Sequence, residues 1–161
     1  MPLPSRAPAR PAATAVLAST ATAVTALLLL AALGTLTEHP LLIPPLAASM
    51  ALIAGAPDLP LAQPRSVIGG QLLSALTGYA VLALTTPAYW SAAIAGGLAL
   101  GVMTLARTPH SPAAATAVIV TLTSPDPRHF LPLLALAAAL LTLTGLAAAR
   151  LRNRRYPTYW W

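Results

Sequence analysis

The side chains best suited to chemistry in this chain are two hydroxyl groups at matching places in two similar stretches. One stretch is "PPLAASMALIAGAPDLP" from Pro44, and the other is "SPAAATAVIVTLTSPDP" from Ser111. Each contains a proline, three residues that are mostly alanine, then Ser49 or Thr116, and an apolar run that ends in Pro-Asp-x-Pro. A hydroxyl group near a helix N-terminus can donate to an anion, which the helix dipole also attracts. The alternative is that small hydroxyl residues simply allow close helix packing.

Three further polar residues have the chemistry of an anion site. Gln71 falls in an apolar segment, where an unpaired amide is costly, so it must bond another helix or face a cavity. His110 precedes the second stretch, and its ring either binds an anion or is a buried histidine bonded to a carbonyl. Arg65 opens an apolar segment and serves either as a topology anchor or as a guide for anions.

Other chemistries find little support in the residue types. The chain has no cysteine, which excludes disulfides and thiolate sites. The histidines at positions 39, 110 and 129 lack metal-ligand spacing, and no Ser-His-Asp, HExxH or paired-acid motif is present. The arginines are scattered at segment ends without a basic face. We therefore expect no enzyme activity, metal or cofactor, and no nucleic acid partner.

The composition indicates that lipid is the solvent of this chain. Of its 161 residues, 57% are hydrophobic and 7% charged, whereas a soluble domain has about a quarter charged residues. An all-α integral membrane protein with the lipid bilayer as its partner follows. All nine basic residues are arginine, beside abundant alanine and proline, which is typical of a GC-rich bacterial genome. The expected location is the bacterial plasma membrane.

Two classes of apolar segment alternate along the chain. Four segments are expected to be full transmembrane helices: 12–34, 66–84, 91–106 and 130–149. The repeated stretches, 44–56 and 112–124, would reach only about 18–20 Å as helices, against a hydrocarbon core of about 30 Å. Pro45 and Pro112 are expected to open these two short helices near the bilayer midplane. The sequence thus predicts about six membrane elements, two of them broken or half-helices.

The arginines predict the topology of these elements. Six crossings with the N-terminus inside put eight arginines in the cytoplasm and one outside, whereas four crossings give six and three. The positive-inside rule favours six crossings with both termini cytoplasmic. Because three elements then occur twice, residues 12–84 and 91–149 are predicted to be inverted repeats. Residues 1–11 form a disordered Pro/Arg-rich tail in this prediction, and 150–161 a basic and aromatic cytoplasmic tail.

A GxxxG pair within segment 91–106 predicts a packing surface. Gly97 and Gly101 lie on one face of that helix, where small residues let another helix approach closely. The neighbour is either the other repeat or a second protomer. A homo-oligomer is therefore one expected partner arrangement.

Three stretches within residues 38–161 carry a family resemblance: "PLLIPPLAASMALIAGAPDLPLAQPRSVIGGQLLSALTGY", "RTPHSPAAATAVI" and the closing "RNRRYPTYWW". They resemble the HPP family of small integral membrane proteins. The naming motif stands here as His110-Ser111-Pro112, Ala113-Ala114 replaces a glycine pair, and Gly69-Gly70-Gln71 replaces "GGH". The resemblance implies that 12–149 is an HPP-like transmembrane domain. Through plastid members of the family, it also implies nitrite transport.

Together these features predict a carrier or channel for a small inorganic anion such as nitrite. The anion would bind between the N-termini of the two half-helices, at Ser49, Thr116, Gln71, His110 and Arg65. The alternative is a membrane scaffold or assembly partner without transport, for which the GxxxG pair and the basic tail would suffice. A polar cavity between the half-helices would favour the carrier, and packed apolar residues there would favour the scaffold.

Overall fold

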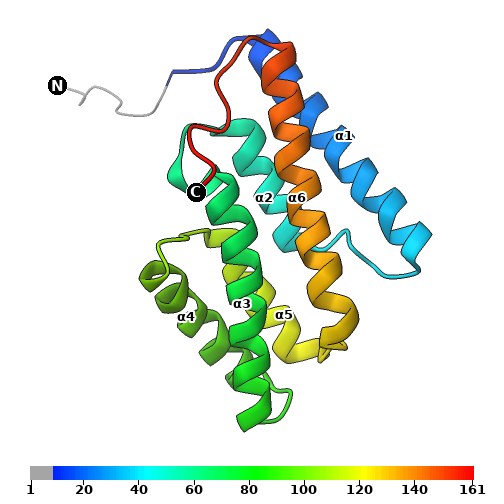
Figure 1. The fold of residues 1–161 in the computed structure, drawn as a ribbon, viewed down its shortest axis with the longest axis vertical. Coiled ribbons are helices and arrows are strands. Elements are labelled where there is room, and N and C mark those ends of the chain that lie inside the picture. Colours follow the sequence, from blue (N-terminus) through cyan, green and yellow to red (C-terminus); the bar gives the residue numbers. More distant parts are fainter. Residues whose placement is uncertain (1–8) are drawn as a thin grey trace, which may run out of the picture.

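The computed structural model describes residues 9–161, and these residues form an all-helical protein (Figure 1). Its elements are α1 (Ala13–Thr37), α2 (Pro44–Gly55), the 3-10 helix η1 (Pro60–Ala62), α3 (Pro64–Leu84), α4 (Tyr89–Leu105), α5 (Ser111–Thr123) and α6 (Pro127–Leu151). The described residues contain no strand. The predicted helical class is confirmed, and each predicted segment corresponds to one α-helix. Most of the predicted N-terminal tail, residues 1–8, lies outside the described part.

Three of the described helices, α1, α3 and α6, are long and apolar enough to cross a membrane. Helix α4 has 17 residues and reaches about 25 Å, which is less than the hydrocarbon core of about 30 Å. Helix α4 corresponds to the predicted crossing 91–106, so only three of the four full transmembrane helices expected from the sequence are confirmed by length. Helices α2 and α5 have 12 and 13 residues and are short, as predicted. The chain is a multi-pass membrane protein.

Prolines set the starts of the short helices. Pro45 lies in the first turn of α2 and Pro112 in the first turn of α5. A proline is tolerated there because the first N–H groups of a helix have no partner within it. At the start of α6 the cap is a side chain, since Asp126 accepts a hydrogen bond of 3.0 Å from the backbone N–H of Arg128. This bond lowers the pKa of the Asp126 carboxyl.

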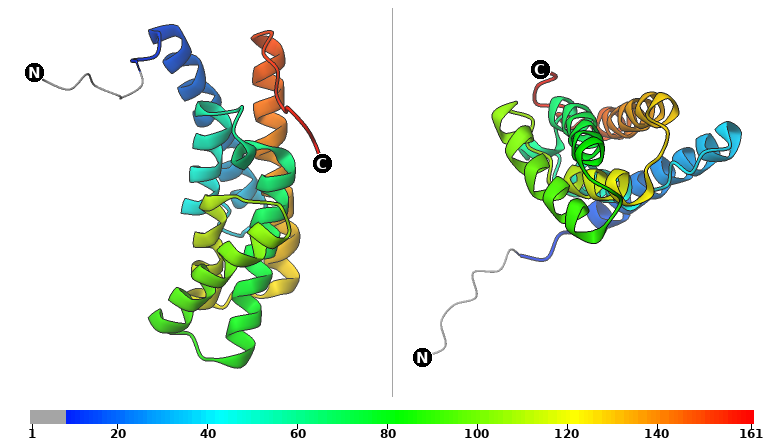
Figure 2. Two further views of the ribbon diagram at one scale, coloured as in Figure 1. Left: turned by 90° about the vertical axis from the view of Figure 1, so that its left-hand side faces the viewer. Right: turned by 90° about the horizontal axis from the view of Figure 1, so that it is seen from below.

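The two short helices start near mid-height of the molecule and run to opposite ends (Figure 2). Helix α2 runs toward the end where α1 begins and α6 finishes, and α5 runs the other way (Figure 1). Helix α2 packs against α1, α5 and α6, while α5 packs against α2, α3 and α4. Helices α3 and α6 contact each other beside the two short helices, and α1 and α4 lie on opposite flanks of the bundle.

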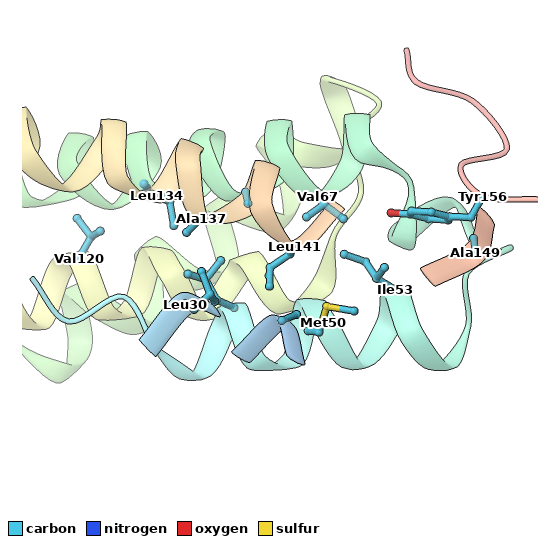
Figure 3. Close-up of a cluster of buried hydrophobic side chains, with 14 residues drawn as sticks. Leu30, Met50, Ile53, Val67, Val120, Leu134, Ala137, Leu141, Ala149 and Tyr156 are labelled. Atoms are coloured by element: carbon cyan, nitrogen blue, oxygen red, sulfur yellow. The ribbon is translucent and has the colours of Figure 1, made fainter. Parts of the chain in front are cut away.

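The core is built from aliphatic side chains of α1, α2 and α6 and from small residues of α3. Leu30, Met50, Ile53 and Leu141 meet in the larger cluster (Figure 3). Close approach of α3 and α5 depends on Gly78, because a Cβ there would lie 2.8 Å from the carbonyl oxygen of Ala117. This distance is too short for a side chain, so the two backbones are in direct contact.

The GxxxG pair is not part of this core. A Cβ at Gly97 or Gly101 would meet no atom within 4 Å, and both residues are exposed on α4. The expectation that this face packs between the two halves of the chain is therefore wrong. The cause is the rotation of α4, which presents Ala95 and Ala99 to the core instead. Packing between protomers stays a prediction.

The C-terminal tail folds back onto the connection between α2 and α3. Tyr156 is buried, and its hydroxyl donates to the carbonyl of Ala62 at 2.9 Å. The backbone N–H of Thr158 donates to Gln63 Oε1 at 2.8 Å. The tail is thus anchored just before α3, on the side where that helix begins.

Thr86 and Thr158 should be accessible from opposite sides of the membrane. Thr158 is bonded to Gln63 before α3, whereas Thr86 follows the end of α3, and both residues are exposed. Because the chain has no cysteine, each position can carry the only thiol. We expect Thr86→Cys and Thr158→Cys to react with an impermeant maleimide from opposite faces of oriented vesicles. Reaction from one face only would mean that α3 does not cross.

Gly78→Ala should destabilise the protein, whereas Gly97→Ala should be tolerated. The first change forces a methyl group against the Ala117 carbonyl, which in packed cores costs about 1–3 kcal/mol. The second places the same methyl group in open space on the same kind of helix. Unfolding in mixed micelles, titrated with a denaturing detergent, measures both changes. Equal stability of the two variants would contradict the contact between α3 and α5.

Candidate functional site

Four polar side chains from three helices meet in one buried network. Gln71 of α3 donates from Nε2 to Ser49 Oγ of α2 at 2.9 Å, and Thr116 of α5 donates from Oγ1 to Gln71 Oε1. Ser49 Oγ also lies 2.7 Å from Nε2 of His110, the N-cap residue of α5. All four side chains are at most 1% exposed. Four of the five predicted substrate residues are therefore in contact.

One amide joins the two hydroxyl groups that the repeated stretches place at matching positions. Gln71 lies in the interior of α3, between α2 and α5, and uses its donor for Ser49 and its acceptor for Thr116. The neighbouring Gly70 makes room for the imidazole, since a Cβ there would lie 2.7 Å from His110 Cβ. The sequence left open whether Gln71 bonds another helix or faces a cavity, and in the structure its amide bonds two other helices.

The partners of His110 define where its hydrogens lie. Its Nδ1 is 2.7 Å from the carbonyl oxygen of Leu61 in η1, so this nitrogen must donate. In the neutral ring Nε2 is then an acceptor for the Ser49 hydroxyl. The same hydroxyl lies 2.8 Å from the carbonyl of Pro45, so one hydrogen serves two acceptors. If the ring were protonated, Nε2 would donate to Ser49 Oγ and the Ser49 hydroxyl would donate to the Pro45 carbonyl. Each of these contacts would then have its own hydrogen.

The backbone of α2 offers no free donor at its first turn. Pro44 and Pro45 have no N–H, and the N–H groups of Leu46 and Ala47 both donate to the carbonyl of Ile43, at 3.0 and 3.3 Å. Only the helix dipole and the side chains are therefore left to attract an anion at the start of α2. Successive prolines remove the donors that a helix N-terminus would normally present.

Arg65 is separate from the network. Its Nη2 donates to the carbonyl of Ala106 at 3.3 Å, and the guanidinium lies 5.5 Å from the ring centroid of Trp161. Its Nε is buried without a hydrogen-bond partner. The side chain thus bridges the C-terminal tail and the connection between α4 and α5, rather than facing Ser49 or Thr116.

Gln63 is a buried polar residue that the sequence analysis did not single out. Its Nε2 donates to the carbonyls of Pro57 and Leu59, at 2.7 and 3.1 Å, and its Oε1 accepts from Thr158. Burial raises the pKa of the Tyr156 hydroxyl, which therefore stays protonated as the donor to Ala62. The only sequence signal was a glutamine before a helix-opening proline, because the Thr158 partner is 95 residues away.

The network is closed by its own contacts. Cavities of about 560 and 310 Å³ lie elsewhere in the described chain, and none of the four network residues lines either one. The four side chains pack into a closed polar cluster, which is neither the polar cavity that would favour a carrier nor the apolar packing that would favour a scaffold. Each polar atom has a partner, which is what burial in an apolar interior requires.

Comparison with known proteins places the chain among transmembrane proteins. Residues 8–157 match the family model described as HPP, transmembrane region. Two transmembrane proteins of Dictyostelium discoideum are 38% and 33% identical to the chain over 125 and 124 residues, each match covering 71% of the chain. These matches cover 44% and 40% of the relatives, so the chain spans less than half of their length. No solved structure matches the chain.

Thr116→Val should destabilise the protein, and Thr116→Ser should not. Valine keeps the shape of threonine but leaves Gln71 Oε1 without this donor, and a hydrogen bond between membrane helices is worth about 0.6–2 kcal/mol. Thr144→Val is the matched control, because the Thr144 hydroxyl donates only to Leu140 of its own helix. Denaturing-detergent titration measures all three variants. Equal losses at positions 116 and 144 would show that Thr116 acts only through its own helix.

Proposed function

The chain belongs to the HPP family of transmembrane proteins, and from this premise we propose that it transports a small inorganic anion such as nitrite. The observation that carries the proposal is the buried network of Ser49, Gln71, His110 and Thr116 where α2 and α5 meet. Polar groups deep in a membrane protein are costly, and they commonly mark the path of a solute. Here four of the eleven buried polar residues of the described chain bond one another at one place.

Inverted repeats are part of this proposal. In this proposal α1, α2 and α3 are equivalent to α4, α5 and α6, and equivalent helices make equivalent contacts. The contact of α1 with α2 corresponds to that of α4 with α5, and the contact of α2 with α6 corresponds to that of α5 with α3. The two short helices also run in opposite directions, as inversion requires (Figure 2). Transporters built from inverted repeats bind their solutes at the repeat junction, beside broken helices. The network lies at that junction.

The charges of the chain favour an anion over a cation. Its three acidic residues, Glu38, Asp58 and Asp126, are exposed and lie outside the helices. A cation at the network would meet no carboxylate, whereas an anion would meet two hydroxyl groups, an amide and an imidazole.

Passage requires the network to open. In the closed arrangement Thr116 donates to Gln71, Gln71 donates to Ser49, and the Ser49 hydroxyl faces His110 and the Pro45 carbonyl, so an anion must replace these bonds. Separation of α2 from α3 and α5 would release Ser49 from Gln71 and His110, while Thr116 would stay bonded to Gln71. Movement of one repeat against the other around a fixed site is the usual mechanism of such folds. We also propose that both termini face the cytoplasm of a bacterial cell, because the arginines at positions 150, 152, 154 and 155 gather at one end.

The contact of Ser49 with His110 resembles a nucleophile with its general base, which raises the question of an enzyme. We propose that it is not one. The third group, which orients the imidazole, is a backbone carbonyl rather than a carboxylate, and Ser49 is fully buried. A hydrolase needs room for its substrate beside the hydroxyl.

A scaffold function is the second proposal, and the outward GxxxG pair favours it. Gly97 and Gly101 are exposed on α4 beside Ile94 and Leu98, which are about half exposed. Such a surface suits helix association in lipid, with a second copy or with another membrane protein. One protein can perform both functions, and a measurement of anion flux shows whether it transports.

Ser49→Ala with Thr116→Ala should reduce anion flux in proteoliposomes. Each change removes a donor worth about 1–2 kcal/mol, between the values for neutral and charged hydrogen bonds, so binding should weaken roughly thirty- to a thousandfold. Nitrite, nitrate and chloride are compared with potassium. Thr77→Ala with Thr144→Ala is the control pair, because these hydroxyls donate only within their own helices. Absence of flux in the wild type would favour the scaffold, and equal flux in both double variants would remove the network from the pathway.

A further inference from the structure

A cavity of about 560 Å³ lies between the start of α1 and the end of α6. The two helices diverge there, and the end of α2 forms the floor of the wedge between them (Figure 2). Its walls carry Ala15 and Val16 from α1, Ile53 and Ala54 from α2, and Ala148 from α6. Ser19 and Thr22 of α1 also line it, with their hydroxyls bonded to carbonyls of their own helix. Both flanking helices are long enough to span a membrane. The wedge therefore opens toward lipid, at a helix end where the headgroups lie.

The rim of this wedge is strongly basic. Arg152, Arg154 and Arg155 line it, against one acidic residue, Asp58, which gives a net charge of +2 (three minus one). The single ion pair among the described residues joins His129 and Asp126, so none of the three guanidinium groups has a carboxylate partner. Each is partly or fully exposed. Three uncompensated cations around an apolar wedge call for an anionic, amphiphilic ligand.

We propose that this wedge binds an anionic phospholipid, with the phosphate at the arginines and the start of an acyl chain against the apolar walls. Guanidinium groups bind phosphate oxygens through paired hydrogen bonds, and basic pockets between transmembrane helices bind acidic headgroups. A soluble anion would gain nothing from the apolar walls. A zwitterionic lipid would gain little from the net charge. Only an anionic lipid uses both parts of the wedge.

Topology alone does not account for this arrangement. Arg150 lies at the same end of α6, where a cation complements the helix dipole and anchors the topology, yet it does not line the wedge. Arg154 and Arg155 follow the helix end, beyond the reach of the dipole argument, and both face the cavity. Arg150 thus provides a control of equal charge at nearly the same height.

The test is lipid binding by the purified full chain, measured without any flux assay. Native mass spectrometry counts bound phosphatidylglycerol and phosphatidylcholine, and inorganic phosphate is added as a competitor. We expect the wild type to prefer phosphatidylglycerol and to keep it in millimolar phosphate. Arg152→Gln with Arg154→Gln and Arg155→Gln should weaken that binding about ten- to a hundredfold. Arg154→Gln alone should weaken it about fivefold, whereas Arg150→Gln, which removes the same single charge, should leave it unchanged.

A second variant keeps every charge and fills the wedge instead. Ala15→Trp places a large ring on the α1 wall and should also expel the lipid, even where the arginine variant does not fold. If Arg150→Gln weakened phosphatidylglycerol binding as much as the wedge variants do, only the general positive charge of this end would matter. If the wild type bound phosphatidylcholine as well as phosphatidylglycerol, the wedge would be an apolar groove without charge selectivity. Displacement by inorganic phosphate would identify a soluble anion site. Each of these three outcomes overturns the proposal.

Discussion

The hydrogen bonds of Gln71 to Ser49 and Thr116 constrain the rest of this structure. A polar side chain inside an apolar helical protein must find a partner, since water is not there to supply one. Satisfying both ends of one amide requires α2, α3 and α5 to meet at a single height. Helix α3 can approach so closely because Gly70 and Gly78 carry no side chain where α5 and its N-cap pass. The glycines are thus a consequence of the polar cluster.

The position of the imidazole depends on residues far away in the sequence. His110 is held by the Leu61 carbonyl in η1, and η1 is held in turn by Tyr156 and Gln63, which bind the C-terminal tail to it. Removing the tail would release the carbonyl that orients His110. The tail therefore belongs to the structural support of the network, although the sequence analysis treated it as a separate basic segment.

The sequence predicted the helices and most of the cluster, for physical reasons that can be named. Hydropathy and helix-opening prolines are local signals, so the starts of α2 and α5 were found within a residue or two. The matching positions of Ser49 and Thr116 in the two stretches also pointed to one site. The rotation of α4, which turns Gly97 outward, depends on contacts with other helices and has no local signal. The same holds for Arg65, whose partners Ala106 and Trp161 are both remote in sequence.

Polar groups in this membrane protein occur in two contrasting environments, the network and the basic wedge. The network is buried and satisfies itself, whereas the wedge is open and its charges need a partner from outside. Part of the wedge lining is apolar, because Ile53 and Tyr156 pack there against Gly145. Helix α2 connects the two sites, since it supplies Ser49 to the network and, one turn later, Ile53 to the wedge. Ser49 and Ile53 are only four residues apart on one helix, so a displacement of α2 that opens the network would also move a residue that lines the wedge.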